Sequence, residues 1–193
     1  MTSSIYETKK MHVDIQPEYV LKVFKKTPGY LTRYHREKRA LKRLSNIPGM
    51  PQLIECSDNT PSLKMTRLPG DNPTWLSDKS LLQLKGMVDQ MLSQGIARHS
   101  LPERDILVDE AGNVSLVDFE RITLKSKRTA PIWKLADKVT RFHLSRLIHQ
   151  HNPMLLTPHE RRQLELGLAL RESFNKVRKV RNKVRGIWRH SHH

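Results

Sequence analysis

The apolar positions in the first third of the chain recur with the two-residue period of strands. Residues 19–24 (Tyr-Val-Leu-Lys-Val-Phe) are rich in β-branched and aromatic side chains and predict a strand. Alternation places Val20, Lys22 and Phe24 on one face of it. Residues 52–56 and 62–66 predict two further strands around a turn, and residues 6–13 leave room for a hairpin arm. A small sheet is therefore expected before residue 67.

Two other stretches have the 3.6-residue period of an amphipathic helix. Residues 30–44 form the first, and its inward stripe consists of Tyr30, Tyr34, Glu37, Leu41 and Leu44. Residues 77–93 form the second, with Ser77 as its N-cap and Gly95 as its stop signal. Its inward stripe consists of Leu81, Leu84, Val88, Met91 and Leu92.

Helical patterns also dominate the last third of the chain. Pro131 opens a helix whose apolar positions Ile132, Leu135, Val139 and Phe142 are expected to face inward. Residues 157–160 (Thr-Pro-His-Glu) form a capping box and predict another helix start. From residue 171 to residue 189, apolar positions recur among many Lys and Arg residues. This basic amphipathic segment suits an anionic membrane surface, with packing on the protein's own core and RNA binding as the alternatives.

Two carboxylates lie thirteen residues apart around a predicted hairpin. Asp105 precedes an apolar strand at 106–108, residues 110–113 form a turn, and a second strand from 114 ends at Asp118. The hairpin brings the two acids to neighbouring ends, the arrangement that holds Mg²⁺ on a nucleotide. The alternative is a surface hairpin that carries two ordinary Asp residues.

Two charged residues fall on apolar faces of their predicted elements. Lys22 needs a carboxylate or a phosphate, because an unpaired buried ammonium group is very costly. Glu37 needs a cation, and Lys22 is the natural partner. The alternatives place Lys22 in solvent on an edge strand and pair Glu37 with Arg33 or Lys38 on the surface.

Composition narrows the function classes. The chain of 193 residues has 35 Lys and Arg against 19 Asp and Glu, a formal charge of +16 that calls for an anionic partner. Anionic lipid headgroups, phosphorylated glycans and nucleic acid all qualify. The single cysteine, Cys56, excludes a disulfide framework and fits a reducing compartment. A polar start and the lack of a long apolar run lead us to expect a cytoplasmic protein, or one peripheral on the inner face of the cell membrane.

Two segments resemble a known family. Residues 98–108 (Arg-His-Ser-Leu-Pro-Glu-Arg-Asp-Ile-Leu-Val), followed by Leu116-Val-Asp118-Phe119-Glu120, are similar to the catalytic loop and the Asp-Phe-Gly motif of protein-kinase-like folds. They most resemble the small bacterial kinases of the lipopolysaccharide core, the Kdo and heptose kinases. The resemblance implies an α+β, minimal two-lobed kinase-like fold. Its expected parts are an N-lobe at 1–66, a C-lobe at 67–170 and a basic C-terminal helix and tail at 171–193.

The resemblance also implies roles for individual residues, with ATP and Mg²⁺ as cofactors. Lys22 would contact the nucleotide phosphates, Glu37 would orient Lys22, and Asp105 with Asp118 would hold the metal. The linker between the lobes would bind the nucleotide base, and its residues are Met65, Arg67 and Leu68.

The chain departs from the kinase pattern at two points. No glycine precedes Lys22, so a glycine-rich loop over the phosphates is absent, and Lys10, Lys25 or Lys26 are candidates to compensate by charge. Ser100 stands where kinases have the Asp that orients the acceptor hydroxyl, which leaves His99 and Glu103 as candidate substitutes.

The expected function is ATP-dependent phosphorylation of a cell-envelope glycan or glycolipid at the cytoplasmic membrane face, by a monomer. The short basic segment after Asp118 has no Ala-Pro-Glu platform for a peptide, which favours a glycan or lipid acceptor. A pseudokinase that binds without turnover is the alternative, and a basic RNA-binding protein is the third. Nucleic acid is the less favoured partner because aromatic residues are sparse, at 6%.

Overall fold

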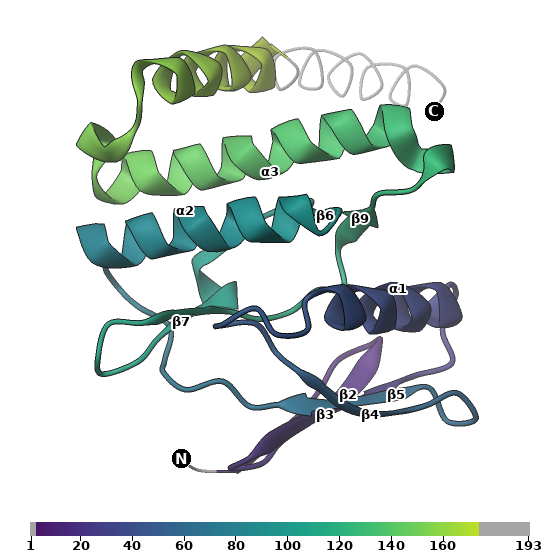
Figure 1. The fold of residues 1–193 in the computed structure, drawn as a ribbon. Helices are drawn as coiled ribbons and strands as arrows, with labels where there is room; N and C mark the ends of the chain where they lie inside the picture. The colour runs from purple at the N-terminus through teal and green to yellow at the C-terminus, as the bar shows by residue number, and fades with distance from the viewer. Residues whose placement is uncertain (1–2, 174–193) are drawn as a thin grey trace, which may run out of the picture.

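The computed structural model describes residues 3–173 of the chain. A small antiparallel sheet and one helix form the N-terminal part, and helices dominate the rest (Figure 1). The expected α+β class, with a small N-terminal sheet and a mainly helical C-terminal part, is confirmed. None of the described helices combines the length and apolarity needed to cross a bilayer. The expected basic helix at 171–189 lies outside the described residues from residue 174 onward.

Five strands in the order β1-β2-β3-β5-β4 make up the N-terminal sheet, all pairing antiparallel. Their bounds are Ser4–Glu7 for β1, Met11–Ile15 for β2, Tyr19–Phe24 for β3, Leu53–Ser57 for β4 and Ser62–Thr66 for β5. Lys22 in β3 lies opposite Val13 of β2 and Leu63 of β5. The strands predicted from alternation at 19–24, 52–56 and 62–66 are all present, and the hairpin arm before them is β1 with β2.

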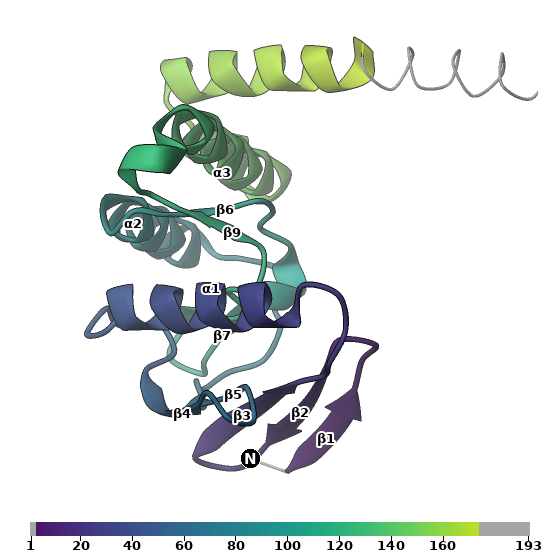
Figure 2. The same cartoon turned by 90° about the vertical axis from the view of Figure 1, so that its right-hand side faces the viewer.

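Helix α1 (Tyr30–Arg43) covers one face of this sheet, as Figures 1 and 2 show. Its buried residues include Tyr34, Glu37 and Leu41, and Leu44 just beyond it is also buried. Tyr34 packs edge-on against Phe24 with ring centroids 5.7 Å apart. The predicted stripe is thus the face that packs on the sheet, and Glu37 enters the core between helix and strand.

Helix α2 (Asp78–Ser93) also packs as its pattern predicts. All five residues of the predicted stripe are buried. The Ser77 hydroxyl accepts a hydrogen bond from the Ser80 amide at the start of the helix. Gly95 follows the end of the helix with φ +73, and a Cβ atom there would lie 2.9 Å from the Lys125 side chain. The start and the end of α2 are therefore both determined by the local sequence.

The predicted inward face of α3 (Ala130–His151) is wrong. Ile132 and Leu135 are exposed, whereas Trp133, Ala136 and Thr140 are buried. The helix is apolar on two sides because it lies between α2 and the helix at 158–173, as Figure 2 shows. Phe142 serves the second side, since a Cβ atom on Gly167 would meet its ring at 2.5 Å. Periodicity alone could not tell the side that faces the core from the side that faces the last helix.

Short strands connect the helices. The predicted hairpin is present as β7 (Ile106–Val108) and β8 (Val114–Leu116), closed by a hydrogen bond of 3.0 Å from the Asp109 amide to the Asn113 carbonyl. A second pair, β6 (Ile96–Arg98) with β9 (Ile122–Leu124), was not predicted. The remaining elements are the single-turn helices η1 (Glu103–Asp105), η2 (Lys127–Thr129) and η3 (Pro153–Leu155). The helix at 158–173 begins at the predicted capping box, where Thr157 and Glu160 exchange hydrogen bonds.

Candidate functional site

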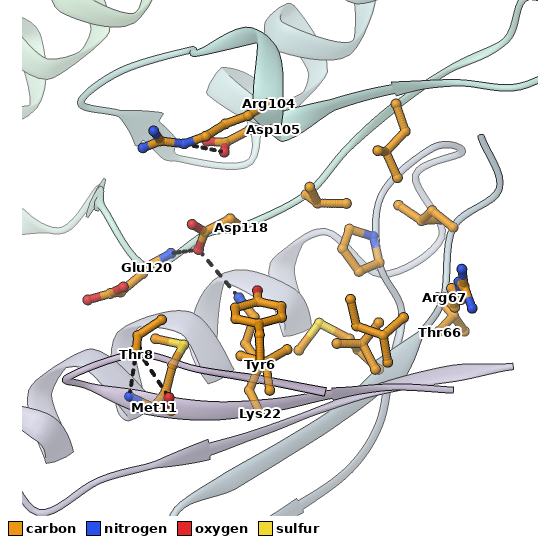
Figure 3. A pocket seen from close by; sticks show the side chains of 18 of the residues that line it. Tyr6, Thr8, Met11, Lys22, Thr66, Arg67, Arg104, Asp105, Asp118 and Glu120 are labelled. Atoms are coloured by element: carbon orange, nitrogen blue, oxygen red, sulfur yellow. Dashed lines mark hydrogen bonds and ion pairs between the residues drawn. The ribbon is translucent and has the colours of Figure 1, made fainter. Parts of the chain in front are cut away.

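A cavity of about 630 Å³ lies between the N-terminal sheet and the segments that carry the two predicted metal ligands (Figure 3). Strands β1 to β3 supply one wall, and η1 with the end of β8 supplies the other. The residues that line it include Tyr6, Thr8, Lys10, Lys22, Met65, Arg67, Leu68, Gly70, Asp105, Asp118 and Glu120. Residues far apart in the sequence, from Tyr6 to Glu120, therefore share one cleft.

The predicted ion pair between Lys22 and Glu37 is present. Lys22 Nζ lies 2.7 Å from Glu37 Oε1, and the two side chains are 9% and 1% exposed. Burial raises the pKa of Glu37, and the charge of Lys22 only partly opposes this. Burial also acts to lower the pKa of Lys22, but attraction to Glu37 and Asp118 outweighs it and raises that pKa above its ordinary value. The ammonium group is thus held in its charged form inside the protein.

Asp118 approaches the same ammonium group from the opposite wall. Its Oδ1 atom lies 3.3 Å from Lys22 Nζ and also accepts from the Glu120 amide at 3.4 Å. The Asp118 side chain is 49% exposed, and its backbone has φ +62, a strained value for a residue other than glycine. Burial raises its pKa, but Lys22 and Arg98 lower it further, so the pKa lies below its ordinary value. Asp118 is an ionised, accessible carboxylate at neutral pH.

Asp105 is held by a buried arginine. Arg98 forms an ion pair with Asp105 Oδ2 and donates to the Val117 carbonyl at 2.9 Å. Its guanidinium group also lies 5.1 Å from the centre of the Phe119 ring. Burial raises the pKa of Asp105, and attraction to Arg98 opposes this. Figure 3 shows Asp118 between Lys22 and Asp105, so the two predicted metal ligands do face one cleft.

Sequence reasoning missed the anchoring role of Arg98. The residue was aligned with a kinase motif, although it also follows Ile96 and Ala97 in an apolar stretch. The rule that identified Lys22, a charge among apolar neighbours, therefore applies to Arg98 as well. Both neighbours are fully buried and Arg98 itself is 3% exposed.

The structure does not bring the three candidate catalytic residues to the cavity. His99 Nε2 lies 2.9 Å from Thr123 Oγ1, away from Asp105 and Asp118. Glu103 Oε1 accepts from Gln150 at 2.8 Å and lies 3.2 Å from His151 Nε2. Ser100 contributes its carbonyl oxygen to Arg98 Nε at 3.3 Å. None of His99, Ser100 and Glu103 is among the residues that line the cleft.

The linker that follows β5 borders the cavity as expected. Met65, Arg67 and Leu68 all line it. The Thr66 amide donates to the Gln52 carbonyl at 2.9 Å and the Arg67 amide donates to the Glu18 carbonyl at 3.1 Å. Within residues 3–173, the Leu68 amide takes part in no backbone hydrogen bond outside the regular elements. Leu68 is therefore the linker residue whose amide can serve a ligand.

Gly70 fixes the end of the linker against β7. It has φ +97, and a Cβ atom there would lie 2.4 Å from the Val108 carbonyl group. The neighbouring residue, Asp71, exchanges two backbone hydrogen bonds with Val108, at 3.2 Å and 2.9 Å. Only glycine can be accommodated at residue 70, because any side chain would collide with the backbone of Val108.

The turn between β1 and β2 covers the cavity without any glycine. Lys10 Nζ lies 3.1 Å from Glu120 Oε1, which joins the turn to the opposite wall. Arg33 Nε lies 3.6 Å from the same oxygen. Lys25, another residue considered for phosphate binding, instead pairs with Glu7 at 2.8 Å. Of the three candidate lysines, Lys10 lines the cleft, and Lys25 and Lys26 do not.

The donor set of the cleft fits a magnesium–nucleotide complex. Asp118 Oδ2 takes part in none of the contacts described above, and Mg²⁺ uses one or two carboxylates together with phosphates and water. Among residues 3–173, no group of three or more His, Cys, Asp or Glu side chains is arranged to hold a metal ion by itself. A metal here would therefore depend on oxygen atoms supplied by its ligand.

Comparisons with known proteins identify the fold. No family model matches the chain, and no curated protein matches it. Among solved structures, a co-crystal of WbdD with the kinase inhibitor LY294002 matches with 17% sequence identity and a TM-score of 0.52. A high-resolution structure of WbdD matches with 18% identity and a TM-score of 0.54. The matches cover 73% and 75% of this chain but only 36% and 37% of the WbdD chains. At these identities they show a shared fold, and the α+β arrangement described above is consistent with a kinase-like one.

Proposed function

We propose that the protein is a phosphotransferase that uses ATP and Mg²⁺ to phosphorylate a glycan or glycolipid of the cell envelope. One observation carries the proposal: a single buried lysine contacts both a helix carboxylate and a cleft carboxylate, at 2.7 and 3.3 Å. An isolated structural ion pair needs only one of these acids. Lys22, Glu37 and Asp118 together match the phosphate-binding and metal-binding parts of a kinase cleft.

Each residue of the cleft has a role in this proposal. Lys22 binds nucleotide phosphate oxygens, and Glu37 holds the Lys22 side chain in position. Asp118 and Asp105 hold Mg²⁺, which neutralises the charge that builds up on the transferred phosphoryl group. Lys10 supports the phosphates from the β1–β2 turn in place of a glycine-rich loop. The linker at Met65, Arg67 and Leu68 accommodates the base.

The proposed acceptor follows from the sequence resemblance to lipopolysaccharide-core kinases and is supported by the fold shared with WbdD. Residues 121–129 link Asp118 to α3 and contain four basic residues, with no peptide platform. The +16 charge suits an anionic glycolipid and an anionic membrane surface on the cytoplasmic side. Membrane attachment through residues 171–189 belongs to the same proposal.

A pseudokinase is the second candidate, and two observations favour it. The Arg98 guanidinium occupies one oxygen of Asp105. The described cleft also contains no side chain in the position of the missing catalytic Asp, since His99, Ser100 and Glu103 all lie outside it. Phosphoryl transfer proceeds through a loose transition state, so positioning and charge can still support turnover without a base. Turnover is therefore the property that separates the two candidates.

The decisive experiment is a titration of the protein with ATP, with and without Mg²⁺, followed by thermal shift and calorimetry. Ligand at a hundred times Kd should stabilise the folded protein by about 2.7 kcal/mol. Asp118→Asn should reduce the effect of Mg²⁺, and chelation of the metal should have the same result in the wild type. Asp89→Asn is the matched control, because Asp89 is an exposed acid on α2 that pairs with Arg141.

Three outcomes are distinguishable. Binding with phosphate transfer to a lipopolysaccharide-core acceptor supports the kinase. Binding without transfer supports the pseudokinase. Absence of nucleotide binding in the wild type contradicts both.

A further inference from the structure

A second group of charges lies beside the cleft and has no role in the proposed mechanism. It is built around His99, which is exposed in the loop after β6. Its ring is fixed by Thr123 of β9 through Nε2 at 2.9 Å, and its amide donates to the Arg121 carbonyl at 3.1 Å. Within residues 3–173, the other ring nitrogen, Nδ1, has no hydrogen-bond partner. The ring is thus held in place with one polar atom available.

Two arginines from different elements act on this ring. Burial lowers the pKa of His99, and the positive charges of Arg36 and Arg121 lower it further. Arg36 comes from α1 and Arg121 from the connection between β8 and β9, and helix α1 packs against β9. In the described part of the chain, neither arginine takes part in an ion pair, and no carboxylate acts on His99.

The surrounding segments do not supply the missing negative charge. Glu37 is the only acid within α1, and it is buried against Lys22. Residues 121–130 contain no acid. Glu120, next to Arg121, is already paired with Lys10 and Arg33. Positive groups that converge without counter-charges repel one another, so the arrangement is stabilised by an external anion.

The group is joined to the cleft through neighbouring residues of the chain. His99 directly follows Arg98, whose side chain holds Asp105. Arg121 directly follows Glu120, which lines the cavity. Figure 2 shows β6 and β9 side by side above α1, which places the three contributing segments together. A ligand on this group would therefore lie beside segments that continue into the walls of the cleft.

We propose that Arg36, His99 and Arg121 form a subsite for a phosphate monoester already carried by the acceptor, so that the enzyme selects a phosphorylated glycan. The role of this subsite in acceptor choice rests on the proposed kinase function. Two guanidinium groups can each form paired hydrogen bonds to phosphate oxygens, and His99 Nδ1 adds a third donor. One compact group of charges fits a single phosphate, whereas a nucleic-acid backbone is contacted at repeated intervals.

The test measures binding of glucose 6-phosphate by NMR and calorimetry, with glucose and inorganic phosphate as reference ligands. The wild type should bind glucose 6-phosphate and not glucose, and the pKa of the His99 ring should rise on binding because a dianion favours the imidazolium form. Arg36→Ala with Arg121→Ala should weaken binding at least tenfold. Arg36→Lys with Arg121→Lys keeps the charge and should restore part of the affinity.

The matched control is Arg39→Ala with Arg128→Ala. It removes the same charge from the same two segments, α1 and residues 121–130, and should change the affinity less than threefold. Equal losses in both double variants would show diffuse surface attraction and overturn the subsite. An unchanged His99 pKa at saturating glucose 6-phosphate would do the same.

Two further arms separate other sources of phosphate. Displacement of glucose 6-phosphate by magnesium-ATP would place it in the nucleotide cleft and overturn the subsite. Binding to phosphatidylglycerol vesicles that depends on Arg36 and Arg121, without binding of the soluble sugar phosphate, would reassign the group to a membrane surface. Lys22→Met should weaken nucleotide binding at least tenfold and leave glucose 6-phosphate binding intact, so that a failure of the kinase proposal can be told apart from a failure of the subsite.

Discussion

Two buried cations each pair with a carboxylate that lines the cleft, and their surroundings differ. Arg98 has one carboxylate partner, Asp105, seven residues along the chain, together with the backbone carbonyls of Ser100 and Val117. Lys22 has two carboxylate partners, Glu37 and Asp118, and they come from distant parts of the sequence. The arginine group lies entirely within the C-terminal part of the molecule, where Arg104 Nε also lies 3.8 Å from Asp105 Oδ1.

The lysine group carries an excess negative charge, and its outer member, Asp118, is half-exposed. A cluster with this charge attracts a divalent cation more strongly than Asp105 does, because the charge of Asp105 is already balanced by Arg98. Both groups therefore contain a buried charge. Only the lysine group also presents a solvent-accessible carboxylate, that of Asp118, which a ligand can contact. We therefore expect Arg98 to act on stability and Lys22 to act on ligand binding.

Removal of the arginine should have the largest effect on folding. Arg98→Met leaves the buried Asp105 with only the exposed Arg104, at 3.8 Å, and breaking a buried pair in this way destabilises by about 3–5 kcal/mol. Urea unfolding measures the loss. Arg98→Met with Asp105→Leu should recover much of it, because no uncompensated charge then remains. A loss below about 1 kcal/mol for the single variant would place Arg98 in the same class as surface pairs.

Removal of the lysine should affect ligand binding more than folding. Lys22→Met should weaken magnesium-ATP binding at least tenfold, which corresponds to about 1.4 kcal/mol. Its effect on unfolding should be smaller than that of Arg98→Met, because Asp118 is half-exposed and the raised pKa of Glu37 allows Glu37 to be neutralised. Calorimetry and urea unfolding of both variants give the comparison. If the loss of binding free energy, divided by the loss of unfolding free energy, were the same for Lys22→Met and Arg98→Met, the two groups would not differ in function.

The two cleft carboxylates should give pH dependences of opposite sign. The pKa of Asp118 is lowered, so its contribution to stability is present above its ordinary pKa of 3.8 and is lost as the pH falls through the folded-state pKa. The pKa of Asp105 is raised, so its ionisation destabilises the fold as the pH rises above 3.8.

Unfolding free energies measured from about pH 2.5 to 7 test these signs. Asp118→Asn should flatten the loss of stability in acid. Asp105→Asn should remove a decline of stability on the alkaline side of pH 3.8. The test compares how steeply the unfolding free energy changes with pH. Its absolute value is not compared, because each variant also loses a contact. Slopes of the same sign would contradict the assignment of the two environments.

Local sequence predicted the parts of the site that lie on long, periodic elements. Lys22 and Glu37 could be paired because each falls on the apolar face of an element with a clear period. Asp105 and Asp118 could be brought together because a short turn joins their strands. The pairing of β6 with β9 could not be predicted, because three residues are too few to show a period and the partners are more than twenty residues apart. The inward face of α3, which packs on β6 and β9, depends on that missing tertiary contact.

The backbone bridge at Gly70 and Asp71 has a consequence for motion. The amides of Asp71 and Val108 are hydrogen-bonded to each other's carbonyl groups, and Gly70 packs directly on the backbone of Val108. The far end of the linker therefore moves as one body with β7 and with Asp105, so any opening of the cleft must be taken up by rotation before residue 70. In hydrogen exchange, the amides of Asp71 and Val108 should share one slow rate, which nucleotide leaves unchanged. The Leu68 amide, two residues earlier, should exchange faster and slow when the cleft is filled.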